Sequence, residues 1–201
     1  MTDIPITKNK VNKKKEEQIR DTVRNAVNLR ELGRLALEND VDALTSLLKD
    51  PLISNPIYTL PDKINQKTIA DFIKQHLLER ARGEGLLMIS TDEEGGVSAY
   101  YDINVWPQWG ACELGGAIRH DQQNSGQGGV GASTAFSWLF GNIGVDLICE
   151  TCSLDNIRTA KLLESAGFVF KCEIESKLST GGFRPSLYWE LKKEDWTSER
   201  G

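Results

Sequence analysis

The sequence predicts an α+β fold, in which one mixed sheet carries helices on both of its faces. Three observations support this prediction. Helical and strand patterns alternate along the chain, two strands joined by a short turn follow the first helices, and the last strands again succeed one another directly. A chain of 201 residues with 39% hydrophobic and 26% charged residues has the length and composition of one domain with a sizeable core.

The first residues of the chain are basic and contain few apolar side chains. Residues 1–15 include five lysines, and we expect them to form a flexible, solvated arm, because a run of like charges is usually a soluble end. From Glu16 to about Leu32, apolar residues fall on one helical face, which predicts an extra N-terminal helix over residues 16–32. Its apolar stripe should pack on the domain or on a second subunit, so a homodimer is a possible assembly.

Two more helices are expected before the sheet-forming part of the chain. Asp40 should cap a helix that ends before Pro51, and another should run from about Gln66 to Arg82. Residues 33–37 fit either helix or strand. Apolar residues then predict strands near 86–89, 97–105, 111–118, 147–149, 169–174 and 187–191, the first two joined by a hairpin turn over 92–96.

A glycine-rich stretch from His120 to Ala132 lies between the strand at 111–118 and a helix expected over 132–140. Glycines leave backbone N–H groups unobstructed, and a loop that ends at a helix N-terminus can hold phosphate oxygens. The stretch therefore indicates a phosphorylated ligand. Gly126–Gly131 fits the dinucleotide pattern G-x-G-x-x-G, whereas Gln123–Gly128 fits Q-x-x-G-x-G, the pyrophosphate loop of acetyl-CoA-dependent acetyltransferases.

The dinucleotide interpretation lacks its usual context. It requires a buried strand that leads directly into the loop and an acidic residue about 20 positions later, at the end of the next strand. About seven polar residues instead separate Ile118 from Gly126, and Asp146 precedes its strand. A nicotinamide dinucleotide-dependent enzyme is therefore the less favoured alternative.

Two further motifs favour the acetyltransferase interpretation. Glu113-Leu114-Gly115 precedes the loop, and Asp155-Asn156 followed by Gly167-Phe168 comes after it. With these motifs in this order, the chain resembles the GNAT superfamily of N-acetyltransferases, and in particular its RimJ/RimL-type branch. The resemblance covers one domain at residues 33–196, with a tail at 197–201.

The resemblance implies a GNAT-like fold with a mostly antiparallel central sheet, whose first strand lies at residues 33–37. It also implies that the two helices between about residues 41 and 82, with their connection, wall the acceptor side. The activity that it implies is acetyl transfer from acetyl-CoA to a primary amine. A non-catalytic acyl-CoA-binding module is the alternative.

The implied acetyl-CoA site combines the loop with the preceding strand. Gly115-Gly116 inside a strand is unfavourable unless it marks a bulge or a close backbone approach, with tight packing on an aromatic as the alternative. By the resemblance, this strand bends away from residues 147–151 and opens a slot for the pantetheine arm, which free N–H groups near residues 117–119 bind. The implied cofactor-binding residues are Ala117, Ile118, Arg119, Gln123, Asn124, Ser125, Gly126, Gln127, Gly128, Gly129 and Asn156.

Catalysis requires a base, because an alkyl ammonium with a pKa of about 10 must lose its proton before it attacks. Glu113 matches the family's acidic strand position and is the first candidate for the general base. A structural strand glutamate is the alternative, and His120, at the mouth of the loop, is a second candidate. Leu163 stands where many GNAT enzymes carry a tyrosine general acid, which leaves Cys149 or water as candidates for the proton donor.

The remaining features limit other classes of function. Cys112, Cys149, Cys152 and Cys172 are expected to be buried reduced thiols, although Cys149–Cys152 is a C-x-x-C, and no metal is expected. No apolar run approaches the ~18 residues of a membrane span, and no signal segment stands at the N-terminus, so we expect a cytoplasmic protein without membrane contact.

The charge balance bears on the partners. Residues 1–20 hold six Lys and Arg against three Asp and Glu, which leaves 18 against 26 for the rest of the chain. This acidic body favours a cationic amine, such as a protein N-terminus, a polyamine or an amino sugar, and no nucleic acid is expected as a partner.

Overall fold

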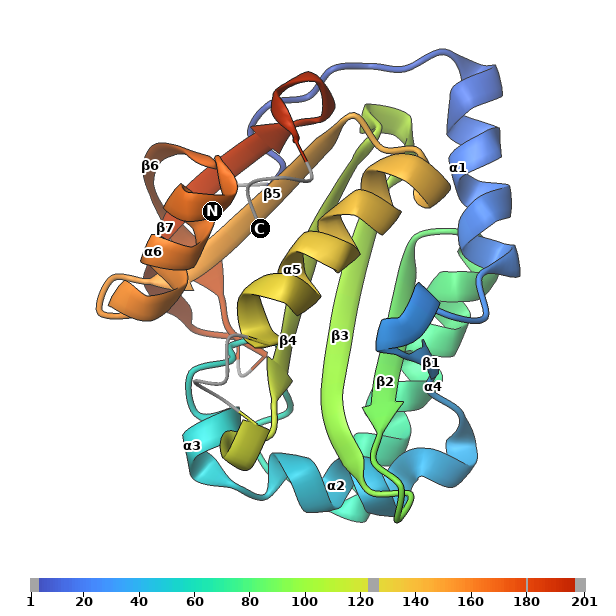
Figure 1. Ribbon diagram of the computed structural model, residues 1–201, viewed down its shortest axis with the longest axis vertical. Helices are drawn as coiled ribbons and strands as arrows, with labels where there is room; N and C mark the ends of the chain where they lie inside the picture. Colours follow the sequence, from blue (N-terminus) through green and yellow to red (C-terminus); the bar gives the residue numbers. More distant parts are fainter. Residues whose placement is uncertain (1–3, 123–126, 180, 198–201) are drawn as a thin grey trace.

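The computed structural model describes residues 4–122, 127–179 and 181–197, and its centre is a seven-stranded sheet (Figure 1). The strands are β1 (Arg34–Leu35), β2 (Gly85–Thr91), β3 (Val97–Trp106), β4 (Ala111–Ile118), β5 (Leu147–Ser153), β6 (Val169–Lys177) and β7 (Phe183–Lys192). They lie in the order β1-β2-β3-β4-β5-β7-β6, and every neighbouring pair is antiparallel except β4 and β5. The expected α+β fold with a mostly antiparallel mixed sheet is confirmed.

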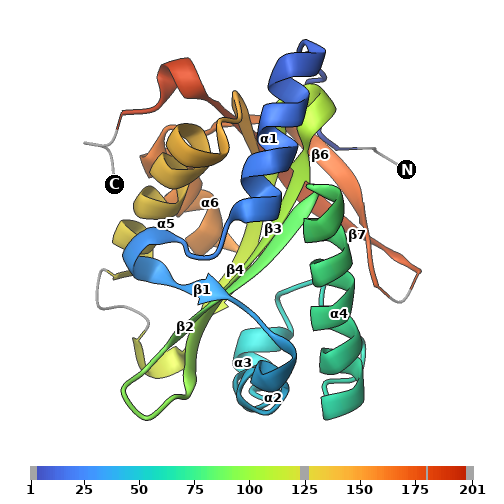
Figure 2. The same ribbon diagram turned by 90° about the vertical axis from the view of Figure 1, so that its right-hand side faces the viewer.

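Helices cover both faces of this sheet (Figures 1 and 2). They are α1 (Lys13–Asn25), α2 (Val41–Leu48), α3 (Pro51–Ser54), α4 (Gln66–Arg82), α5 (Gln127–Trp138), which a π-helical turn continues to Ile143, and α6 (Ile157–Ala166). Helices α1, α5 and α6 pack on one face, and α2 and α4 pack on the other. Among the described residues, no helix is long and apolar enough to cross a membrane.

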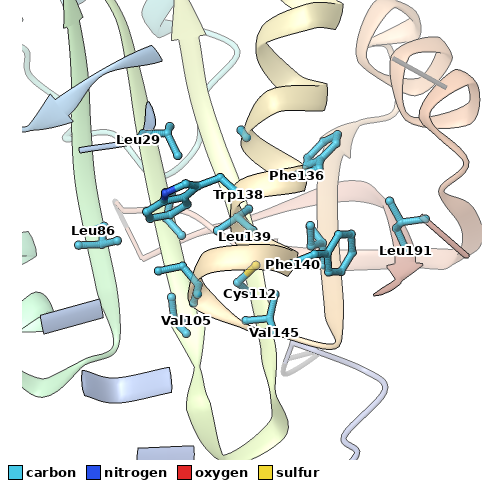
Figure 3. Close-up of a cluster of buried hydrophobic side chains, with 14 of the residues drawn as sticks. Leu29, Leu86, Val105, Cys112, Phe136, Trp138, Leu139, Phe140, Val145 and Leu191 are labelled. Atoms are coloured by element: carbon cyan, nitrogen blue, oxygen red, sulfur yellow. The ribbon is translucent and has the colours of Figure 1, made fainter. Parts of the chain in front are cut away.

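Two hydrophobic layers hold the sheet between these helices. On the α5 face, Phe136 and Leu139 pack with Leu86, Val105 and Cys112 of the strands (Figure 3). The layer on the opposite face comprises Ala36, Leu44, Leu47, Leu48, Ile53, Leu60, Ile69, Ile73, Leu87, Ile89, Val97 and Tyr100. Since both faces are packed, the strands that carry polar residues between the layers are held in fixed positions.

The expected N-terminal helix is present with different bounds. Helix α1 begins at Lys13, where the Asn12 side chain accepts a hydrogen bond from the Lys15 N–H at 2.9 Å. It ends at Asn25, and residues 30–32 form a separate 3₁₀ turn. The prediction of one helix to residue 32 is therefore wrong at its C-terminal end.

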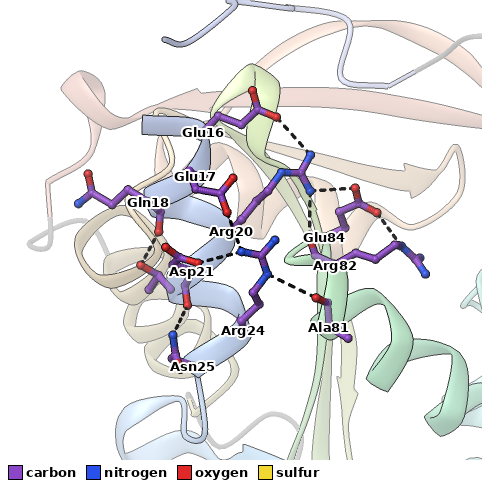
Figure 4. A network of polar contacts seen from close by, with 11 residues as sticks. Glu16, Glu17, Gln18, Arg20, Asp21, Arg24, Asn25, Ala81, Arg82 and Glu84 are labelled. Carbon is purple, nitrogen blue, oxygen red and sulfur yellow. Dashed lines mark hydrogen bonds and ion pairs between the residues drawn. The ribbon is translucent and has the colours of Figure 1, made fainter. Parts of the chain in front are cut away.

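The apolar stripe of α1 packs on the domain itself. Ile19 and Val23 are fully buried in the α5-face layer. On the polar side of the helix, Arg20 donates to the Glu84 carboxylate and to the Arg82 carbonyl oxygen, each at 2.9 Å (Figure 4). These contacts join α1 to the end of α4 and the start of β2.

The N-terminal segment also departs from expectation, because residues 4–7 lie against β7. The Ile6 N–H donates to the Tyr188 hydroxyl at 3.0 Å, and the Thr7 N–H and hydroxyl donate to the Glu190 carboxylate at 3.0 and 2.8 Å. Glu190 is buried and needs such partners. The expected solvated arm is therefore wrong for residues 4–7, and residues 13–15 belong to the first turn of α1 instead.

The ambiguous segment 33–37 contributes strand β1, which pairs with β2 as the family resemblance implies. The Arg34 guanidinium binds both carboxylate oxygens of Asp40 at 2.8 Å, and the Leu37 N–H donates to the same carboxylate. Because these groups occupy Asp40, its side chain makes no capping bond to α2, and that predicted cap is wrong. The hairpin turn over 92–96 is confirmed by a bond from the Asp92 N–H to the Gly96 oxygen at 2.8 Å.

Candidate active site

The candidate active site lies where the parallel strands β4 and β5 separate. Their pairing comprises Ala111 with Leu147, Cys112 with Ile148 and Glu113 with Cys149, and it stops there. One residue further, the Leu114 N–H donates to the Glu150 carboxyl group at 3.2 Å. A cavity of about 830 Å³ opens at this split, lined by parts of β3, β4, β5, the α3–α4 connection and α6. The predicted opening between β4 and residues 147–151 is therefore present only from residue 150 onward, because residues 147–149 still pair with β4.

Gly116 allows β4 to take this course. Its φ is +144°, and a Cβ atom at this position would lie 2.2 Å from the Tyr100 carbonyl oxygen. The pairing of β3 with β4 runs without interruption along the whole of β4, so the strand contains no bulge. The close backbone approach that the glycine pair predicted is therefore confirmed at Gly116.

Along β4, successive backbone N–H groups point alternately toward β3 and toward the split. In an antiparallel ladder, alternate residues bond to the neighbouring strand. The Arg119 N–H donates to the Ser98 oxygen at 2.8 Å, so the N–H groups of Leu114 and Gly116 point away from β3, toward β5. By the same alternation the Ala117 N–H points to its β3 partner Tyr100, so the prediction of free N–H groups is wrong for both Ala117 and Arg119.

Glu113 lies on the α2/α4 face of the split within a small hydrogen-bonded cluster. The Thr151 hydroxyl donates to its carboxylate at 2.8 Å, and the Tyr58 hydroxyl approaches the same oxygen at 3.3 Å. Burial raises the pKa of Glu113 to about 7, and the negative charge of Asp102 adds to this shift although the Thr151 bond opposes it. A carboxyl group with this pKa can accept protons near neutral pH.

Tyr58 enters this cluster from the α3–α4 connection. Burial raises the pKa of its phenol well above the usual range, with the charge of Glu113 as the next cause, so Tyr58 stays protonated and can donate. The Arg184 guanidinium lies 4.8 Å from the centre of the Tyr58 ring. The connection implied to wall the acceptor side thus places a hydrogen-bond donor beside Glu113.

A second carboxylate, Asp102, lines the same face of the cavity. His76 of α4 bonds Asp102 through Nε2 at 2.9 Å and the Phe72 carbonyl oxygen through Nδ1 at 2.9 Å. Burial alone would lower the pKa of His76, but the bond to Asp102 and its charge raise it to about 9. At neutral pH the pair is an imidazolium bound to a carboxylate.

The structure places part of the predicted cofactor site. Ala117, Ile118 and Asn156 line the cavity, and the Asn156 side chain also accepts a bond from the Thr159 N–H at 3.1 Å, which caps α6. Gly129 lies in the first turn of α5, where the space that a Cβ would take is open. Gln123, Asn124, Ser125 and Gly126 lie outside the described residues, and of Gln127 and Gly128 only the place in the first turn of α5 is described.

The other candidates lie apart from Glu113. His120 is exposed on a 3₁₀ turn and does not line the cavity. Cys149 is buried against Ile174 and Tyr188, whereas Cys152 belongs to the α5-face layer. Since two residues three apart on a strand point to opposite faces, the C-x-x-C cannot form one site, and all four cysteines are unpaired thiols. Within the described ranges, no three or more His, Cys, Asp or Glu residues are grouped to hold a metal ion.

Sequence reasoning missed four polar residues around the split, namely Tyr58, Asp102, Glu150 and Thr151. Strand alternation could have found Thr151, since it lies two residues after Cys149, the register partner of Glu113. Tyr58 lies in an irregular connection, and no periodic pattern marks it.

Comparisons with known proteins agree with this architecture. Residues 29–169 match the family of the acetyltransferase (GNAT) domain. No curated protein sequence matches the chain significantly.

Three solved structures illustrate the shared fold. RimJ from Mycobacterium smegmatis in complex with CoA-disulfide has a TM-score of 0.71 and 14% identity, covering 84% of this chain and 86% of that one. A ribosomal-protein-S5-alanine acetyltransferase from Vibrio fischeri has a TM-score of 0.68 and 14% identity, over 82% and 94%. A variant of spermidine N-acetyltransferase SpeG from Vibrio cholerae has a TM-score of 0.66 and 13% identity, over 84% and 99%. The split sheet and the match over residues 29–169 show that this chain belongs to the GNAT acetyltransferase family.

Proposed function

We propose that the protein transfers the acetyl group of acetyl-CoA to a primary amine, with Glu113 as the general base. The observation that carries this proposal is the buried Glu113 carboxyl group at the split between β4 and β5, with hydroxyl donors around it and a pKa of about 7. Membership of the GNAT family supports acetyl-CoA as the donor.

The described residues fit the donor. The split gives a polar arm access to strand N–H groups that do not pair with β3, and Asn156 lines the same cavity. Helix α5 begins at Gln127, so its first two residues are the last two of the predicted pyrophosphate loop, Gln123–Gly128, and its N-terminus can face phosphate oxygens. Acetyl-CoA supplies an activated acyl carbon with a thiol leaving group. Its phosphates belong at α5 and its pantetheine arm in the split.

The amine that accepts the acetyl group belongs on the α2/α4 face of the sheet, opposite to helix α5. Asp102 and Glu113 both line this side, and their carboxyl groups favour the approach of an ammonium group. Glu113 takes a proton from the ammonium, directly or through a water, and the free amine attacks the acetyl carbon. The names of the similar structures include protein and polyamine acetyltransferases, so we propose a protein N-terminus or a polyamine as the first acceptors to test, followed by an amino sugar.

Two measurements test the proposal. Calorimetry should show micromolar binding of acetyl-CoA and no binding of NAD or NADP. A panel of amines incubated with acetyl-CoA should yield at least one N-acetylated product and one equivalent of free CoA thiol. Binding of CoA without acetylation of any amine would support a non-catalytic acyl-CoA-binding module instead, and binding of NAD in place of CoA would refute both.

A further inference from the structure

The sequence leaves the departing thiolate without a proton donor, and the structure narrows the choice. Leu163, at the position of the usual tyrosine, is buried in the α5-face layer. Cys149 is buried outside the cavity. Glu150 is a cavity-lining acid at the split, and the proposed function gives it no role.

Glu150 and Glu113 lie on opposite sides of the same opening. Along β5, Ile148 and Cys152 point into the α5-face layer, so Glu150 between them points to that face. Glu113 instead contacts Tyr58 and Thr151 on the other face. Glu150 thus lies on the same face of the sheet as α5, the helix proposed to bind the phosphates of acetyl-CoA. Glu113, the proposed base, lies on the other face together with the proposed amine site.

The surroundings of Glu150 favour its protonated form. Its side chain is 7% exposed, and the Leu114 N–H is the hydrogen-bond donor that the structure gives it. Burial raises the pKa of Glu150 well above the usual carboxyl range, and the nearby charge of Glu113 adds to the shift.

We propose that Glu150 is the general acid of the acetyl transfer. As the bond between the amine nitrogen and the acetyl carbon forms, the carbon–sulfur bond breaks, and its electron pair goes to sulfur. Glu150 gives its proton to this sulfur, while Glu113 on the opposite face takes the proton of the amine. Glu150 then regains one proton from solvent. Glu113 releases two, the first taken from the ammonium before the attack and the second from the nitrogen as the amide forms, so each turnover gives an amide, a thiol and one net proton. Two carboxyl groups with separated pKa values thus take opposite roles.

This inference rests on the proposed function, but its first test does not require acetyl-CoA. Infrared spectra of the ligand-free Glu113→Gln protein at pH 8 should contain the band of a buried protonated carboxyl group. That band should disappear in the double variant Glu113→Gln/Glu150→Gln. A band unchanged by the second substitution would show that Glu150 is ionised and would overturn the proposal, whether or not any amine is acetylated.

The second test separates acid catalysis from structural support. Glu150→Gln should lower turnover with acetyl-CoA by about 10²-fold while CoA binding stays within about 2-fold of the parent. With acetyl-seleno-CoA the loss should nearly vanish, because a selenol is much more acidic and leaves as its anion. The matched control is Glu190→Gln, another buried glutamate, which lies outside the cavity and should change neither rate.

Two results of this test would contradict the acid role. An equal loss with both donors, or no loss with either, would mean that Glu150 does not protonate the leaving group. A parent protein that acetylates no amine would instead refute the proposed function, and the infrared result would still stand by itself.

Discussion

The two faces of the β4–β5 split treat the same type of residue differently. Glu113 and Glu150 are 6% and 7% exposed on neighbouring strands, so both lose most of their hydration. Glu113 receives hydroxyl hydrogen bonds, whereas Glu150 receives one backbone N–H. The pKa of Glu113 consequently stays near 7, while burial keeps that of Glu150 well above the usual range. Hydrogen-bond donors, more than depth, decide which buried carboxyl group can act as a base.

The largest expected effect concerns the base itself. Glu113→Gln keeps the shape of the side chain but cannot accept a proton, so turnover at pH 7 should fall by about 10²–10⁴-fold. CoA affinity should stay near that of the parent. The loss should shrink as the pH approaches the acceptor's own pKa of about 10, where the amine is already deprotonated. Steady-state rates from pH 6 to 10 provide the measurement, and an equally active variant at pH 7 would mean that Glu113 is structural.

Much of the fold could be predicted from the sequence, because its determinants are local. Apolar periodicity placed α4 at its observed bounds, and Gly167 ends α6 in the left-handed conformation, as a glycine after a helix predicts. Asp40 shows where local reasoning fails. Its cap position was correct, but Arg34, which precedes it on β1, occupies its carboxylate.

The candidate site was only partly predictable, since it depends on contacts between distant segments. Glu113 and the bend at Gly116 follow from the motif and the glycine pair. The donor Tyr58 is 55 residues away from Glu113 in the chain, and only the tertiary fold brings them together. The raised pKa of Glu150 likewise results from its burial, which depends on the packing of several segments that are distant in the sequence.

A stability effect should distinguish the two glycines of β4. Gly116→Ala places a methyl group against the Tyr100 carbonyl oxygen, at a residue whose φ is +144°. This substitution should lower the free energy of unfolding by about 3 kcal/mol. Gly115→Ala is the matched control, since its Cβ would lie 3.7 Å from Asp102, an ordinary contact, and should cost less than about 1 kcal/mol. Urea denaturation measures both. Equal effects would mean that the close approach at Gly116 does not constrain the strand.

The ion pair behind the acceptor face should give a pH-dependent stability. His76 faces Asp102, Glu79 and the Phe72 carbonyl oxygen, and its pKa rises to about 9 from an ordinary 6.5. The stabilisation is therefore fully present below pH 6.5 and is lost as the pH rises through 9. Relative to His76→Gln, the parent should lose on the order of 2–3 kcal/mol of unfolding free energy between pH 6 and 10. Parallel stability curves for the two proteins would show that folding does not shift the pKa of His76.

The smallest effect concerns the hydroxyl donors that distinguish the acceptor face from the donor face. Thr151 and Tyr58 stabilise the ionised form of Glu113, and the Thr151 bond is shorter, at 2.8 Å against 3.3 Å. Removing either donor should raise the pKa of Glu113, so the rise of kcat/KM with pH should move to higher pH. We expect a displacement of about one pH unit for Thr151→Val and less for Tyr58→Phe. Above pH 9 both variants should recover the parent's rate, since Glu113 is then ionised in all three proteins. A loss of the same size at every pH would mean that these hydroxyls position the substrate and do not set the proton affinity of Glu113.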